Sequence, residues 1–224
     1  MSRIIHDCAQ GTPEWFACRS GLLTASVAHV PFLAGKSKDK ESTTRRDLRT
    51  QLALERIVGV SCAPEFSNSD TERGKALEAE ALAAYEAHTG TLLSRVGFVS
   101  RDDIAIGCSP DGAVMPNAEA ITGGVDAKCP RPSNHLAYLR DPASLVSAYE
   151  AQIRHTLLTV GTAAWWDLAS YCPVFPPASR LLVVRVDVRG VDLAAHELVV
   201  RQFLREVDKE EAEIRRMSDN QEAA

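Results

Sequence analysis

The sequence predicts an α/β (α+β) fold in which a central mixed β-sheet is flanked by helices. The first observation is length, because 224 residues suit one domain with a sizeable core. The second is composition: 45% hydrophobic and 25% charged residues are ordinary for a globular protein and argue against disorder. The third is the order of the segments, since helical patterns come first and strand-like and helical patterns then alternate.

The N-terminal part, about residues 1–60, is expected to be helical. Thr12 followed by Pro13 is typical of a helix N-cap and its first helical position. A second helix start is expected at Thr24-Ala25-Ser26. Farther on, a polar loop is expected to become a helix near Thr43.

Residues 70–190 are expected to form the central part of the domain. Its first helix should stop at Gly90, because glycine accepts the left-handed conformation that ends many helices. A loop containing Pro130 and Pro132 should lead through a short helix to a longer one. The expected longer helices span 71–88, 144–160 and a charged C-terminal 191–217, and the expected strands span 91–99, 103–109, 124–129, 163–171 and 180–188.

The charge balance limits how the protein could bind nucleic acid. Its net charge is −5, whereas a nucleic-acid-binding domain is usually basic over a whole face. Any DNA contact must therefore come from a local patch. Residues 36–56 carry Lys36, Lys38, Lys40, Arg45, Arg46, Arg49 and Arg56. This stretch is either a solvated charged face or a patch that contacts phosphates.

Membrane and secreted classes are not favoured. No apolar run approaches the ~20 residues that cross a bilayer, and the polar first residues do not resemble a signal peptide. Six cysteines lie singly along the chain without a Cys-x-x-Cys pair, so a structural zinc site is not expected. We expect reduced thiols in a cytoplasmic protein, the host cytoplasm if the chain is phage-encoded.

Glu78 lies at the edge of an apolar helix face that contains Leu77, Ala81, Leu82 and Tyr85. A carboxylate turned toward a core is costly unless something compensates its charge. It either reaches water or pairs with an arginine, or it is a metal ligand or acid–base group.

Four further residues also have both a structural and a functional interpretation. Asp111 lies in Ser-Pro-Asp-Gly, which is a good β-turn sequence but could equally present a carboxylate. Asp126 and Lys128 alternate along a strand and so share a face, as an exposed ion pair or as a metal carboxylate beside an ammonium. Gln152 is the polar member of a buried helix stripe, as a satisfied core amide or as part of a site.

The order of these residues is more specific than any one of them. Glu78 is followed 33 residues later by Asp111, and Asp126-x-Lys128 comes 15 residues after that. An acidic helix residue before a β-hairpin with Asp and (Asp/Glu)-x-Lys is the order of the PD-(D/E)xK restriction-endonuclease-like core. Phosphodiester hydrolysis needs metal ions to neutralise charge and activate water, and hard oxygen ligands suit Mg²⁺.

Five motifs in order resemble the phage lambda exonuclease family, the alkaline exonuclease or viral recombinase branch of that superfamily. They are Trp15-x-x-x-Arg19-x-Gly21-x-x-Thr24-Ala25-Ser26, Gly74-Lys75-x-x-Glu78, Cys108-Ser109-Pro110-Asp111-Gly112, Lys128-Cys129-Pro130 and Ser147-Ala148-Tyr149-x-Ala151-Gln152. By this resemblance the whole chain, 1–224, is one exonuclease domain with its nuclease core over about 70–190.

The resemblance also implies roles for the site residues. Mg²⁺, or Mn²⁺ in its place, would be held by Glu78, Asp111, Asp126 and the main-chain carbonyl of Ala127. Lys128 and Gln152 would act on the attacking water. Arg19, Ser26 and Arg131 would bind the 5′ phosphate of the digested strand.

Two features depart from the family pattern. The family usually has Glu-x-Lys where this chain has Asp126-x-Lys128, although the wider superfamily accepts aspartate there. Asn134 stands where a basic, phosphate-contacting residue is expected, and Arg131 nearby could replace it.

The resemblance implies a Mg²⁺-dependent 5′→3′ exonuclease that acts on double-stranded DNA ends and leaves 3′ single strands for recombination. It also implies a single-strand annealing protein as partner and a ring-shaped homotrimer. Two alternatives remain: another PD-(D/E)xK nuclease, such as a RecB-like or structure-specific endonuclease, or a catalytically inactive DNA-binding module on the same fold.

Overall fold

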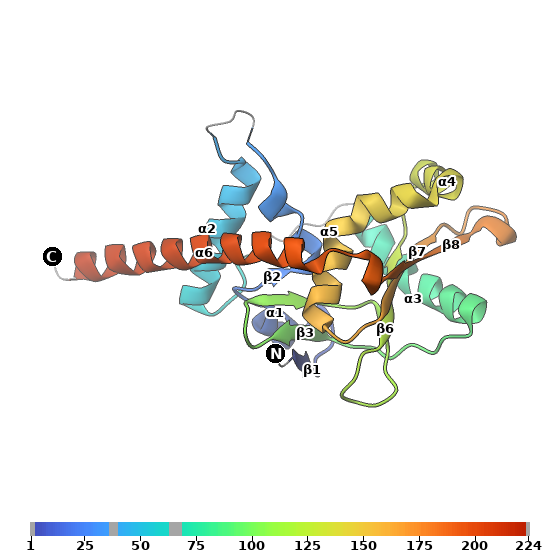
Figure 1. The fold of residues 1–224 in the computed structure, drawn as a ribbon, viewed down its shortest axis with the longest axis horizontal. Coiled ribbons are helices and arrows are strands. Elements are labelled where there is room, and N and C mark those ends of the chain that lie inside the picture. Colours follow the sequence, from blue (N-terminus) through green and yellow to red (C-terminus); the bar gives the residue numbers. More distant parts are fainter. Residues whose placement is uncertain (1–2, 36–39, 63–68, 223–224) are drawn as a thin grey trace.

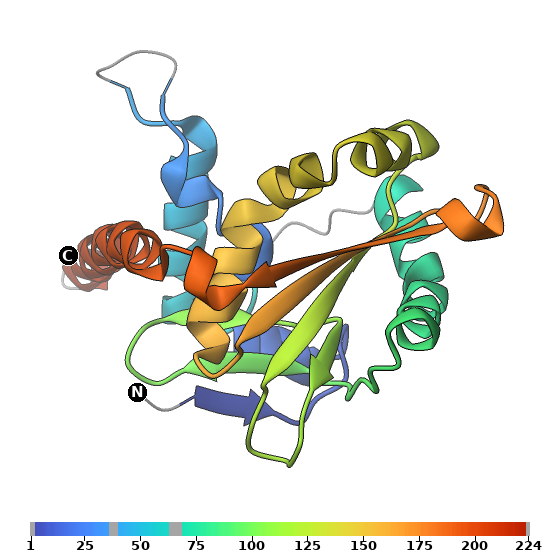
Figure 2. The ribbon, with the colours of Figure 1, turned by 45° about the vertical axis from the view of Figure 1, so that its right-hand side comes forward.

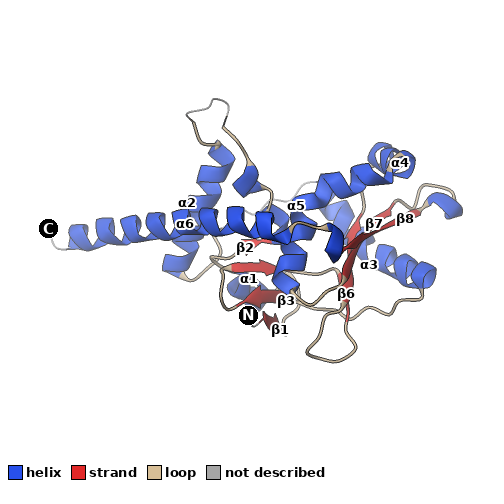
Figure 3. Ribbon diagram, in the orientation of Figure 1, coloured by secondary structure: helices blue, strands red, loops and turns tan. Residues whose placement is uncertain are grey.

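The structure is a computed structural model that describes residues 3–35, 40–62 and 69–222. Its helices are α1 (Pro13–Arg19), α2 (Thr43–Val58), α3 (Ser69–Thr89), α4 (Pro132–Arg140), α5 (Pro142–Val160) and α6 (Leu193–Glu222). Its strands are β1 (Arg3–His6), β2 (Leu23–Thr24), β3 (Phe98–Arg101), β4 (Ile106–Cys108), β5 (Gly112–Val114), β6 (Gly123–Lys128), β7 (Trp165–Tyr171) and β8 (Leu181–Asp187). Figures 1 and 3 show that α6 extends well beyond the body of the molecule.

The expected α/β class is confirmed, but the strands form two mixed sheets where one was expected. One sheet has the order β1-β3-β4-β2 and the other β5-β6-β7-β8. Each contains one parallel pair, β2 with β4 and β6 with β7. The division falls at Ser109-Pro110-Asp111, where proline lacks the N–H that would continue a ladder.

Two helices cover opposite faces of the second sheet. Trp166 and Leu168 of β7 pack in one core with Ile153 and Leu157 of α5. The alternate residue Ala169 packs instead with α3, in a cluster that includes Leu82 and Val125. Figure 2 shows α5 and α3 on either side of β6 and β7. The strand face that carries Asp126 and Lys128 is therefore the one turned toward α5.

Most expected helices are confirmed. The Thr12 hydroxyl accepts a hydrogen bond from the main-chain N–H of Trp15, which caps α1 as expected. The helix expected at Thr24 is instead a short 3₁₀ turn over Ala25–Val27. Strand β1 was not predicted because its four residues show no clear alternation of polarity. In the described residues, no helix is long and apolar enough to cross a membrane.

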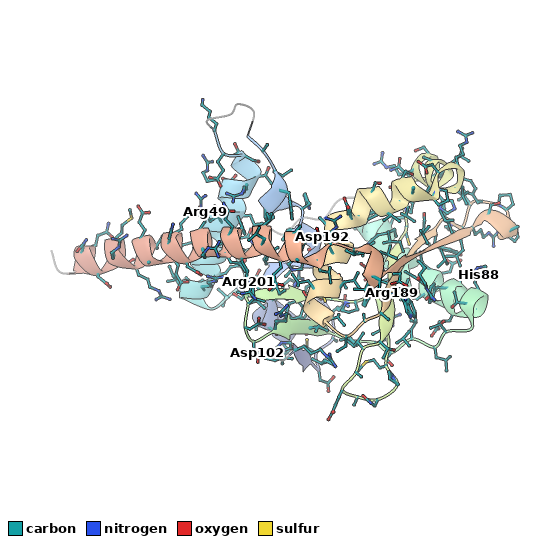
Figure 4. The ribbon with its side chains drawn as sticks, in the orientation of Figure 1. Arg49, His88, Asp102, Arg189, Asp192 and Arg201 are labelled. Atoms are coloured by element: carbon teal, nitrogen blue, oxygen red, sulfur yellow. The ribbon has the colours of Figure 1, made fainter. Side chains whose placement is uncertain are left out.

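The basic stretch 36–56 has a role that neither sequence interpretation gave. Arg45 pairs bidentately with Glu206 of α6, with N–O distances of 2.7 and 3.0 Å. Arg49, labelled in Figure 4, pairs with Glu210, and Arg56 lies 2.7 Å from Asp208. These arginines thus join α2 to α6, and are already paired. Two lysines of the same stretch, Lys36 and Lys38, lie outside the described residues.

Candidate active site

The β5–β6 hairpin brings Asp111 and Asp126 together. Asp111 directly precedes β5, whose Gly112 lies opposite Val125 of β6. The Asp111 carboxylate accepts a hydrogen bond of 2.8 Å from the main-chain N–H of Ala127. The turn expected at Ser-Pro-Asp-Gly is therefore the entry to a hairpin that presents its aspartate beside β6.

Asp126 is 2% exposed, so its carboxylate depends on protein groups for solvation. The side-chain amide of Gln152, on α5, donates a hydrogen bond of 2.9 Å to Asp126 Oδ2. Gln152 therefore lies beside the buried Asp126 carboxylate, which is where a role in the candidate site would require it. Each aspartate receives this hydrogen bond at Oδ2, and among the described residues no hydrogen bond is formed at either Oδ1.

Electrostatic interactions confirm that the charged groups lie close together. Burial, followed by repulsion from Asp126, raises the pKa of Asp111 to about 7. Burial by itself would lower the pKa of Lys128, but the carboxylates of Asp126 and Asp111 outweigh it and the pKa is raised. Lys128 is therefore an ammonium beside two carboxylates. Ionisation of one of them, Asp111, is made unfavourable by burial and by the charge of Asp126.

Glu78 lies at the rim of this group. It is half-buried on α3 and lies 3.4 Å from the guanidinium of exposed Arg95, which also donates to the carbonyl of Asp111. The pairing with an arginine that the sequence allowed is therefore present. Within the described segments, no three Asp, Glu, His or Cys side chains gather closely enough to form a metal centre by themselves.

Arg19 occupies a distinct position next to the same hairpin. Its guanidinium lies over the ring of Trp15, 3.7 Å from the ring centroid. The Trp15 indole N–H donates to Ser109 Oγ at 2.9 Å, two residues before Asp111. The structure gives Arg19 no ion pair with any described carboxylate, and burial lowers its pKa. Trp15 is thus a half-buried platform for Arg19.

Ser26 is not joined to Arg19 by a hydrogen bond. It is exposed on the 3₁₀ turn, and its hydroxyl lies 3.3 Å from that of Thr24. Because this turn is only three residues long, the helix start expected at Thr24-Ala25-Ser26 does not provide an α-helix N-terminus that could bind an anion at Ser26.

A cavity of about 880 Å³ opens beside Lys128. Its lining includes Arg131 and Asn134, the two residues at which this chain differs from the phosphate-contacting pattern of the family. Both therefore face the same cavity. Arg73 and Tyr149 also line it, and sequence reasoning gave neither a role. Arg73 donates a 2.9 Å hydrogen bond to the carbonyl of Cys129. Its position five residues before Glu78 was the available signal.

Known proteins resemble the chain over the segments that carry this site. The model of the YqaJ-like viral recombinase domain matches residues 14–163, which include Arg19, Glu78, both aspartates, Lys128 and Gln152. No curated protein sequence matches the chain.

Solved structures share the fold. An alkaline exonuclease (LHK-Exo) from Laribacter hongkongensis is 27% identical with a TM-score of 0.77, covering 93% of this chain and 99% of that one. The same exonuclease in complex with dAMP has a TM-score of 0.78, with the same identity and coverage. A phage related exonuclease from Haemophilus somnus, 14% identical with a TM-score of 0.64, covers 88% of this chain and 96% of that one, and shares the fold. With two thirds of its length matched by the family model, the chain belongs to the YqaJ-like viral recombinase domain family.

Proposed function

We propose that the protein is a DNA exonuclease that hydrolyses phosphodiester bonds of double-stranded DNA from the 5′ end, with Mg²⁺, and leaves a 3′ single strand. The observation that carries the proposal is the pairing of Asp111 and Asp126 at one hairpin, with Lys128 and Gln152 beside them. Family membership and the similarity to an alkaline exonuclease support it.

The residues present fit a divalent metal ion. Asp111 and Asp126 offer hard oxygen donors, and the raised pKa of Asp111 reports negative charge that a cation would stabilise. Mg²⁺ usually binds through only one or two carboxylates, with waters and substrate phosphates as its other ligands. Asp111 and Asp126 would hold it, joined by Glu78 and the carbonyl of Ala127. When bound, Mg²⁺ neutralises phosphate charge and lowers the pKa of an attacking water.

The remaining site residues position groups around these carboxylates. The Gln152 amide fixes one orientation of the Asp126 carboxylate, and the Ala127 N–H does the same for Asp111. The Lys128 ammonium can orient the attacking water or stabilise charge that develops on the phosphate. Mn²⁺, with similar ligand preferences, would be expected to replace Mg²⁺.

The 5′ phosphate would be bound by Arg19, with Ser26 and Arg131 contributing. A guanidinium presents a planar fork of donors that matches phosphate oxygens, and Arg19 forms no ion pair with a carboxylate of the described residues. Since Arg131 lines the cavity beside Lys128, its contact would fall near the scissile phosphate. A single-strand annealing protein as partner and a ring-shaped homotrimer are proposed from the family resemblance alone.

The test is digestion of end-labelled linear duplex and closed circular duplex, each with and without Mg²⁺. We expect loss of the linear substrate only with Mg²⁺, release of mononucleotides from 5′ ends and no attack on the circle. Cleavage of the circle would indicate an endonuclease. Binding without digestion of either substrate would indicate an inactive DNA-binding module.

A further inference from the structure

The Lys128 ammonium is held by an aromatic ring. Its Nζ lies 4.9 Å from the centroid of the Tyr149 ring, within the distance at which a cation is attracted to an aromatic face. Across the part of the chain that the structure describes, this ammonium forms no hydrogen bond and no ion pair within 4.0 Å. A ring face attracts the charge without occupying any of the three N–H donors.

Tyr149 is itself held in place by core packing. Its ring packs against the core cluster that α5 shares with the second sheet. The phenol of Tyr138, on α4, lies close enough to that of Tyr149 to interact with it electrostatically. The backbone at Tyr149 departs from helical values, with φ −120° and ψ 16°, so α5 is kinked at this residue. Gln152 lies one turn farther along the same helix, so one helix segment carries the partners of both Asp126 and Lys128.

We propose that Tyr149 is a positioning residue for Lys128, and this inference rests on the proposed function. The ring holds the ammonium at the wall of the 880 Å³ cavity, which both residues line. Its N–H groups therefore remain free to bind the attacking water or a phosphate oxygen. An ion pair with Asp126 or Asp111 would instead use those donors and draw the ammonium onto the carboxylates that a metal requires.

Two simpler roles for Tyr149 make different predictions. If the ring only fills space, its removal would lower stability and reduce activity equally whether or not Lys128 is present. If the ring stacks on DNA, its removal would weaken DNA binding. A positioning role predicts a slower cleavage step, unchanged affinity and complete dependence on Lys128.

The experiment measures single-turnover cleavage of a 5′-phosphorylated duplex at saturating protein with Mg²⁺, together with DNA affinity in Ca²⁺. We expect Tyr149→Leu to slow cleavage roughly three- to thirtyfold, the range for loss of a cation–π contact, with affinity changed less than about twofold. Tyr149→Phe keeps the ring and should retain most of the rate. Tyr138→Phe removes the neighbouring phenol on α4 while leaving the Tyr149 ring, and is the matched control that should keep the wild-type rate.

The double variant separates this inference from the proposed function. In a Lys128→Ala background, Tyr149→Leu should cause no further loss of rate. An equal loss in both backgrounds would overturn the positioning role and leave the proposed function intact. A wild-type rate for Lys128→Ala would instead overturn the catalytic assignment of Lys128, and the role of Tyr149 with it.

A ring-electronics series answers the same question if Tyr149→Leu does not fold. Tyr149 is replaced by phenylalanine and by a series of increasingly fluorinated phenylalanines. Fluorination weakens the attraction of the ring for a cation at nearly constant shape. The cleavage rate should fall stepwise with fluorination, and should not do so in the Lys128→Ala background. A rate independent of fluorination would overturn the proposal.

Discussion

Asp111 and Asp126 are costly residues for a fold to retain. Both are carboxylates in one partly dehydrated site, and their repulsion raises the pKa of Asp111. Hydrogen bonds from Ala127 and Gln152 offset only part of that cost. A site whose charge is under-compensated in this way is the kind that a divalent cation stabilises.

The catalytic candidates could be predicted because order along a chain encodes them. Strand alternation places Asp126 and Lys128 on one face, and the structure confirms this placement. Tyr149 could not be distinguished in the same way, because its ring also packs against the core cluster, as expected for a residue one turn from Ile153 on the same helix face. Periodicity shows which side chains share a face, whereas the neighbour of that face depends on tertiary structure.

Arg19 yields a prediction about end recognition. If its guanidinium binds the terminal phosphate, the wild type should digest a 5′-phosphorylated duplex faster than a 5′-hydroxyl duplex. Arg19→Ala should reduce this ratio by about tenfold, since a charge-assisted hydrogen bond is lost. Initial rates on the two substrates measure the ratio, with Arg189→Ala, an exposed arginine paired to Asp187, as the control. Equal wild-type rates on both ends would contradict the assignment.

At the scale of elements, α6 shows what charge patterning cannot predict. The sequence presents the arginines of α2 and the carboxylates of α6 about 160 positions apart, so each set resembles a solvated face. In the structure the two sets meet across the α2–α6 packing, above buried Leu52 and Phe203. A face that seems available for phosphates is thus already neutralised within the fold.

The Arg45–Glu206 pair predicts a stability effect. Its side chains are only 15% and 28% exposed, so solvent screens the pair weakly. Arg45→Glu should lower the free energy of unfolding by about 2 kcal/mol, because it places a carboxylate beside Glu206 and Glu41. Urea unfolding measures the change, and adding Glu206→Arg should restore much of it. Arg46→Glu, at an exposed position, should change stability by no more than about 0.5 kcal/mol.

Two buried histidines join α5 to α6. His155 contacts the carbonyl of Leu23 at 2.9 Å, and its other ring nitrogen lies 3.4 Å from His196. Burial and the neighbouring His196 lower the pKa of His155 to about 3, while burial and Arg154 lower that of His196 to about 4. Both are therefore neutral in the folded protein at neutral pH.

This pair predicts acid sensitivity. Because the unfolded pKa of 6.5 exceeds both folded values, the stabilisation is complete above pH 6.5 and is lost as the pH falls toward 4. Between pH 6 and 5 the free energy of unfolding should fall by about 1.4 kcal/mol per unit for each histidine. Urea unfolding at several pH values measures this dependence. In His196→Leu, the free energy of unfolding should fall less steeply with decreasing pH, by the contribution of one histidine. Exposed His29→Gln should match the wild type. An unchanged slope in His196→Leu would contradict this account.

At the scale of the molecule, the class and most helices could be predicted, and the division into two sheets could not. The sequence at Ser109-Pro110 is equally compatible with a turn within one sheet and with a boundary between two sheets, because local sequence does not specify which strands pair. The break leaves Asp111, a candidate metal ligand, and Ser109 at the junction of the two sheets. Ser109 there contacts Trp15 and hence the Arg19 platform.

The net charge of −5 predicts weak dependence of DNA binding on salt. With three arginines of α2 engaged by α6, the basic stretch 36–56 has fewer cations left for phosphates. For Asp126→Asn protein, the plot of log K against log salt concentration should have a slope no steeper than about −4, since each neutralised phosphate contributes about −0.9. Fluorescence anisotropy across a salt series gives the slope. A value near −8 would require an extensive basic surface.

The most direct test of the central claim is the rate of mononucleotide release from a linear, 5′-phosphorylated duplex in Mg²⁺ by folded Asp126→Asn. Asparagine keeps an oxygen that can accept from Gln152 but removes the charge that would hold the metal. We predict a rate at least a thousandfold below wild type, as for loss of several kcal/mol of transition-state stabilisation. Asp219→Asn, on the exposed end of α6, should retain the wild-type rate. Near-normal digestion by Asp126→Asn would contradict the assignment of this site.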